Sequence, residues 1–186
     1  RHGEVVLARG ERLTPQAVGL TASVGIATVK VYSPRVLILT SGDEIQSPEE
    51  SPLPGKIFDS NGPLLTQLLQ QSGFVNVHRE HLPDDPAIIR ETLNDLLTDS
   101  AQRPDVIIST GGVSVGEEDH LRAVLAEQGE LDFWRLAIKP GKPFTYGNLG
   151  GIPFFGLPGN PSAVLVCYLM LVLPMLRRCC GADAVL

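Results

Sequence analysis

Two unbroken runs of β-favouring residues limit what this chain can fold into. They are RVLILT at residues 35–40 and PDVIIST at residues 104–110. Runs without an alternating polar face are typical of strands that are covered on both sides. Such strands occur in parallel sheets, whose neighbouring strands are joined by helical crossovers that pack against the sheet.

Helical patterns separate these runs. Residues 63–72 place leucines on one helical face, with Ser60 or Asn61 as the cap, and residues 86–99 repeat the pattern after a capping Asp85. The alternation predicts a three-layer α/β/α sandwich around a mostly parallel sheet. The other expected elements are a helix from Thr14 to about Gly25, a stop at Gly73, strands at 28–31, 74–80 and 133–138, a helix at 120–129, a hairpin closed over 148–151, and an apolar helix at 163–176.

The chain is expected to contain one main domain. Its 186 residues suffice for one well-buried core. We assign residues 35–186 to the α/β domain and residues 1–34 to an entry segment with one helix and one short strand. Because the chain starts at Arg1 and not at methionine, we expect a fragment of a longer multidomain protein.

Composition argues against several classes of partner. A net charge of −6 without a Lys/Arg cluster disfavours nucleic-acid binding. The apolar run 163–176 is shorter than the ~20 residues of a membrane span and contains Pro174, so we expect a buried helix and no membrane partner.

No secretion signal opens the chain, which predicts a cytoplasmic location. Cys167, Cys179 and Cys180 are expected to be free thiols.

Unusual loops follow nearly every predicted strand. Ligands of open parallel sheets bind at the carboxyl ends of the strands, where these loops gather. The site is therefore expected at that edge. In chain order, the loops carry SGDE, PDD, GGVSVGEED, KPGKP and LPGNPS.

The glycine-rich loop suits an oxyanion. Gly111, Gly112 and Gly116 allow the backbone to turn sharply and present its amides. Glu117 stands where a P-loop has its lysine, which argues against an NTPase. A tight turn without a ligand is an equally simple explanation.

Two further loops suit an anion. Lys139 and Lys142 lie in a loop stiffened by prolines and glycine, where they can act as fixed counter-charges, although surface lysines often show this spacing. Asn160, Pro161 and Ser162 open the apolar helix, whose amides favour an anion. Helix capping is a complete alternative for these three residues.

Carboxylates accompany these loops. Glu44, Asp84 or Asp85, and Asp119 belong to loops at the same edge, and Asp59 begins a helix. Acids beside an anion site would repel the ligand unless a hard cation such as Mg²⁺ lies between them, so the pattern predicts a magnesium site. For each acid alone, capping or solvation also explains its presence.

The motifs TGGVSVGEED, KPGKP and GLPGNP, with SGDE upstream and FDSN between, resemble those of the molybdopterin molybdenumtransferase family, the MoeA type that includes the E domain of gephyrin. The resemblance covers essentially the whole chain in order. It implies a transferase that inserts molybdate into adenylylated molybdopterin, a pterin nucleotide, with Mg²⁺-dependent release of AMP. It also implies a homodimer in the full-length protein.

The resemblance also implies roles for individual residues. Glu44, Asp84 and Asp119 correspond to the active-site acids and metal ligands, and Lys139 to a catalytic, positively charged position facing the same pocket. The residues implied to bind the pterin or nucleotide are Asp59, Ser60, Gly111, Gly112, Ser114, Arg135, Lys142, Asn160 and Ser162.

Alternatives to this enzyme remain. SGDE replaces the more common TGDE, and the longer amino-terminal region and small carboxy-terminal β domain of the family are absent from the chain. The same fold could serve as a non-catalytic molybdopterin-binding or scaffold domain, or could cleave another pyrophosphate-linked nucleotide. KPGKP together with GLPGNP favours the molybdenum branch.

Overall fold

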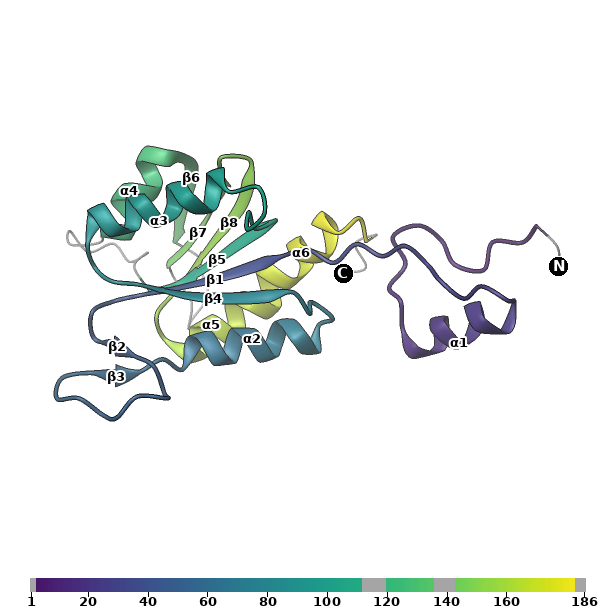
Figure 1. The fold of residues 1–186 in the computed structure, drawn as a ribbon, viewed down its shortest axis with the longest axis horizontal. Helices are drawn as coiled ribbons and strands as arrows, with labels where there is room; N and C mark the ends of the chain where they lie inside the picture. Colours follow the sequence, from purple (N-terminus) through teal and green to yellow (C-terminus); the bar gives the residue numbers. More distant parts are fainter. Residues whose placement is uncertain (1–2, 112–119, 136–142, 183–186) are drawn as a thin grey trace.

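The computed structural model describes residues 3–111, 120–135 and 143–182. A six-stranded sheet in the order β4-β1-β5-β8-β7-β6 forms its centre (Figure 1). The parallel strands are β4 (Val77–Leu82), β1 (Val36–Ser41), β5 (Val106–Thr110) and β8 (Ile152–Leu157). The strand β7 (Pro143–Leu149) is antiparallel to both β8 and β6 (Gly129–Arg135).

Helices cover both faces of this sheet, which confirms the predicted α/β/α sandwich. In Figure 1, α3 (Pro86–Thr98) and α4 (His120–Gln128) lie together on one face. The opposite face carries α2 (Asn61–Gln71), α5 (Pro161–Cys167), the π-helical turn η1 (Tyr168–Val172) and α6 (Leu173–Cys179).

The strands at the centre of the sheet are buried on both faces, as the apolar runs predict. In β1, Val36 and Ile38 pack into the core on the α2 and α5 face, whereas Leu37 and Leu39 pack on the α3 and α4 face. All six residues of β1 are buried. Alternate side chains of one continuous apolar run therefore serve two cores.

The end of α2 follows a Schellman motif. Gly73 has a φ of +95° and its N–H donates to the Gln70 carbonyl at 3.0 Å. The N–H of Phe74 reaches the Leu69 carbonyl at 2.9 Å, and the Phe74 ring enters the core. Gly73 is therefore the helix stop that the sequence predicts. Because Phe74 completes this cap, the next strand begins at Val77 and not at residue 74.

The long apolar helix is interrupted by a π-helical turn. Pro174 has no N–H to donate to the preceding turn, and η1 ends two residues before it. A wider turn accommodates the missing hydrogen bond without ending the helix. The combined helix, Pro161–Cys179, is longer than the predicted one, and by length and composition it would be sufficient to cross a membrane. Its buried residues, which include Val164, Tyr168, Val172 and Leu176, belong to the core.

Two predictions about short segments were wrong or incomplete. The expected strand at 28–31 is absent from this described segment, where Val29 and Val31 are exposed and pair with no strand of the sheet. Strand propensity without a partner does not form a ladder. Two short strands not predicted, β2 (Ile45–Gln46) and β3 (Ile57–Phe58), pair at the ends of the predicted loop 47–56.

The first helix and the closing hairpin agree with the sequence. The helix α1 (Pro15–Ser23) follows Thr14, whose Oγ1 accepts from the Ala17 N–H at 3.2 Å, and it lies apart from the sheet in Figure 1. The β7–β8 turn is held by Asn148, whose Oδ1 accepts from the Gly151 N–H at 2.6 Å. Gly129 was expected to end the helix that precedes it, but it is the first residue of β6. A Cβ on Gly129 would collide with the Asn148 carbonyl oxygen on the neighbouring strand.

Candidate functional site

The strand directions bring the predicted loops to one edge of the sheet. β1, β4, β5 and β8 are parallel, and β6 shares their direction because both β6 and β8 are antiparallel to β7. The loops after these strands therefore leave from the same side. This common edge is the candidate site. The strands end there at Ser41, Leu82, Thr110, Arg135 and Leu157.

Glu44 folds back over the first turn of this edge. Gly42 has a φ of +129°, and a Cβ placed on it would lie 2.5 Å from one Glu44 carboxylate oxygen and 2.9 Å from the other. The glycine in SGDE thus leaves room for the acid two residues later. This packing explains why the two residue types occur together.

Gly42→Ala is expected to lower the free energy of unfolding by about 1–3 kcal/mol, because alanine is strained at this backbone conformation and its Cβ displaces the Glu44 carboxylate. Chemical denaturation measures the change. In a Glu44→Ala background the same substitution should cost less, since only backbone strain remains. Equal costs in both backgrounds would contradict the proposed packing.

Asp84 is held by a neighbouring acid that the sequence did not single out. The Asp84 N–H donates to Asp43 Oδ1 at 2.9 Å, which links the loop after β4 to the loop after β1. The Lys56 ammonium contacts the Asp43 carbonyl oxygen. Glu44 and Asp84 therefore lie on two connected loops. Asp85 caps α3, accepting from the Ala87 N–H at 2.7 Å, as predicted.

The entry to α2 differs from the predicted capping. Ser60 occupies the N-cap position but its side chain makes no capping hydrogen bond. Asp59 caps the helix instead, with Oδ1 accepting from the Gly62 N–H at 2.9 Å. The predicted N-cap position at Ser60 is therefore correct, but the capping hydrogen bond comes from Asp59, for which capping was the alternative explanation. A Cβ at Gly62 would meet the Asp59 carboxylate, so FDSNG again pairs an acid with a glycine that leaves it space.

Asn61, the other expected cap, reaches out of its helix. Its Nδ2 donates to Thr110 Oγ1 at 2.9 Å and to the Gly159 carbonyl at 2.7 Å. The motif FDSN was the only local indication of this residue, because both contacts depend on distant parts of the chain.

The start of α5 is capped by its own asparagine. Asn160 Oδ1 accepts from the N–H groups of Ser162 at 2.9 Å and Ala163 at 3.4 Å. The capping alternative thus holds for Asn160, and Ser162 provides a hydroxyl beside it in the first turn.

Most of the remaining predicted residues lie outside the described ranges. Arg135 ends β6, and its side chain is not described. Within the described ranges, no three His, Cys, Asp or Glu side chains gather closely enough to hold a metal ion. The predicted magnesium site depends on Asp119 as the third acid and remains a prediction. The residues outside the described ranges are Gly112, Ser114, Asp119, Lys139 and Lys142.

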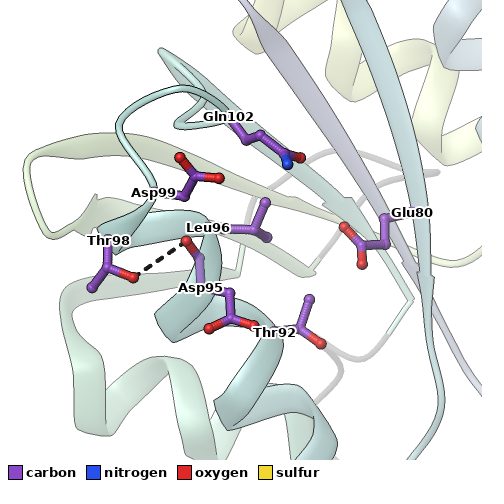
Figure 2. Close-up of a pocket in the computed structure, with 7 residues that line it drawn as sticks. All are labelled: Glu80, Thr92, Asp95, Leu96, Thr98, Asp99 and Gln102. Atoms are coloured by element: carbon purple, nitrogen blue, oxygen red, sulfur yellow. Dashed lines mark hydrogen bonds between the residues drawn. The ribbon is translucent and has the colours of Figure 1, made fainter.

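A separate polar hollow of about 540 Å³ lies between β4 and α3 (Figure 2). Glu80 lines the hollow from β4, and burial raises the pKa of its carboxyl group. The hollow contains none of the residues predicted from sequence, and its residues Asp99 and Gln102 precede the amino end of β5, so we place the candidate site at the common edge. Its lining residues are Glu80, Thr92, Asp95, Leu96, Thr98, Asp99 and Gln102.

Known proteins resemble the chain over nearly its whole length. A molybdopterin molybdenumtransferase of Haemophilus influenzae is 39% identical over 182 residues, which are 97% of this chain and 44% of that protein. The molybdenum cofactor synthesis protein cinnamon of Drosophila melanogaster is 39% identical over 165 residues, 88% of this chain and 27% of that protein. The chain thus spans less than half of these relatives.

Solved structures agree with the fold. A molybdopterin biosynthesis MoeA protein of Pyrococcus horikoshii superposes with a TM-score of 0.78 at 32% identity, covering 95% of this chain and 43% of that one. The MoaB structure of Thermus thermophilus, at 19% identity and a TM-score of 0.54, covers 81% of this chain and 99% of its own and shares the fold alone. The family described as "Probable molybdopterin binding domain" matches residues 37–178. Because this match includes most of the sheet and its helices, the chain belongs to the family of molybdopterin-binding domains.

Proposed function

We propose that this chain acts in molybdenum cofactor biosynthesis, as the part of a longer protein that binds adenylylated molybdopterin. In this proposal, molybdate is inserted into the pterin and AMP is released in a Mg²⁺-dependent step. The active protein would be a cytoplasmic homodimer. The observation that carries the proposal is that the strands preceding the family's loop motifs all end at one sheet edge, in a chain that the family model matches.

The carboxylates of the described acids are ligands of the type that a hard cation binds. Glu44 and Asp84 are exposed carboxylates on loops joined by the Asp43 hydrogen bond, and carboxylate oxygens are the ligands that Mg²⁺ prefers. Asp119 would complete this set. When bound, Mg²⁺ would offset charge on the phosphoanhydride.

The other residues of the edge would bind and orient the ligand. Asp59 and Asn160 fix the starts of α2 and α5, so that Ser60 and Ser162 stand at defined places beside the loops. Lys139 and Lys142 would balance the negative charge of the diphosphate. Gly111 would allow the backbone after β5 to approach it.

The test measures binding of adenylylated molybdopterin to the purified chain by calorimetry, with and without Mg²⁺, and release of AMP after molybdate is added. Binding with AMP release supports the transferase. Binding without release supports the non-catalytic binding domain. Absence of binding under all conditions contradicts the proposed ligand.

Glu44→Gln is expected to slow Mg²⁺-dependent AMP release roughly tenfold or more, since it removes one negative charge from the metal site. Glu80→Gln is the matched control, because Glu80 lies in the separate hollow between β4 and α3. Its AMP release should equal that of the unchanged chain. An equal loss in both variants would argue against a special role for Glu44.

A further inference from the structure

Asn61 connects segments that are distant in sequence. It is the first residue of α2, and its side-chain nitrogen contacts Thr110, 49 residues away, and Gly159, 98 residues away. The Gly159 carbonyl can only accept a hydrogen bond, so the nitrogen of the carboxamide must face it. The side chain is thereby held in one orientation.

The same network continues through Thr110. The Thr110 Oγ1 accepts from Asn61 and donates to the Pro158 carbonyl at 3.2 Å. Thr110 is only 2% exposed, so water does not readily replace these partners. Two hydrogen bonds to neighbouring carbonyls thus join the end of β5 and the start of α2 to the loop after β8.

Each joined segment carries one of the loop motifs. Asn61 belongs to FDSN, Thr110 directly precedes Gly111, and Gly159 belongs to GLPGNP. The remaining acceptor, Asn61 Oδ1, is buried and has no hydrogen-bond partner among the residues that the structure describes. The hydrogen bonds of Asn61 and Thr110 therefore link three segments of the candidate site.

We propose that Asn61 is a positioning residue, which holds the start of α2, the end of β5 and the loop after β8 in the arrangement that binds ligand. The connection itself follows from the hydrogen bonds in the free protein. Its effect on ligand affinity rests on the proposed function, so each part has its own measurement.

The first measurement is hydrogen–deuterium exchange of the free chain. Asn61→Asp keeps the side-chain shape but removes both donated hydrogen bonds, and it should speed exchange about three- to tenfold in peptides covering residues 108–111 and 158–163. Asn148→Ala is the matched control, because it removes an asparagine hydrogen bond at the opposite edge of the sheet. Its faster exchange should be confined to the β7–β8 turn.

The second measurement is calorimetric affinity for adenylylated molybdopterin. Asn61→Asp and Thr110→Val should each weaken binding roughly tenfold, and the double variant should be little worse than either, since both break one network. Thr110→Ser retains the hydroxyl and should bind like the unchanged chain. Asn148→Ala should also bind normally, although it lowers stability.

The outcomes separate the two proposals. Unchanged exchange at either connected segment in Asn61→Asp, or Thr110→Ser binding as weakly as Thr110→Val, would overturn the positioning role. Normal affinity of Asn61→Asp despite faster exchange would overturn it as well. If the unchanged chain binds no adenylylated molybdopterin, the proposed function fails, whereas the exchange results still decide whether Asn61 connects the segments.

Discussion

Replacing Gly111 with alanine is expected to lower the free energy of unfolding by about 2–5 kcal/mol. The φ of this residue is +79°, a conformation that costs alanine about 1–2 kcal/mol. In addition, the new Cβ would lie 2.7 Å from the Ser41 carbonyl oxygen. Ser41 is buried at the end of β1, so relief requires backbone movement and adds about 1–3 kcal/mol. Urea denaturation of the purified variant measures the loss.

Gly151→Ala separates the two contributions to this loss. Gly151 has a similar φ of +89°, but the nearest atom to a new Cβ is the Arg103 side chain at 3.5 Å. Its cost should be limited to the backbone strain of about 1–2 kcal/mol. A loss at Gly111 no larger than that at Gly151 would show that the approach of Gly111 to β1 is unimportant for stability.

The layers of the fold could be predicted because their signals are local. Residues 35–40 and 104–110 lack a polar face, and the helices between them carry caps and stops that act within a few residues. Where a strand depends on a distant partner, the local signal fails. Residues 28–31 have strand propensity, yet they lie outside the sheet and form no ladder.

The position of the candidate site was predictable, but the contacts within it were less so. Parallel strands joined by helices send their following loops to one edge, which requires only the order of elements. By contrast, Asp43 becomes informative only when its contact with Asp84, 41 residues later, is known. The same holds for Asn61, because the local sequence does not show whether its side chain caps the helix or contacts distant loops.

The capping of α2 illustrates a smaller failure of the same kind. Asp59, Ser60 and Asn61 are all residue types that cap helices, so their order alone does not choose among them. In the structure, Asp59 makes the capping hydrogen bond, and the side chain of Asn61 instead contacts Thr110. A local ambiguity of one residue therefore hid the network that connects three of the loops.

Leu176→Ala is expected to lower the free energy of unfolding by about 2–5 kcal/mol, the range for leucines whose removal leaves a cavity in a packed core. Leu176 is fully buried in the combined helix Pro161–Cys179. Met170 on the same helix is 68% exposed, so Met170→Ala should change stability by less than about 0.5 kcal/mol. Thermal and urea denaturation in aqueous buffer measure both variants.

These two variants test whether the apolar residues of the helix pack in a protein core or cross a membrane. Length and hydropathy treat Leu176 and Met170 alike, and on those measures the helix resembles a membrane span. A core helix of the α/β domain instead requires its buried and exposed faces to differ sharply, because only the buried face loses contacts when it is truncated. Equal small effects at both positions would contradict the core role of this helix, and with it the support that α5 receives where it begins at the candidate site.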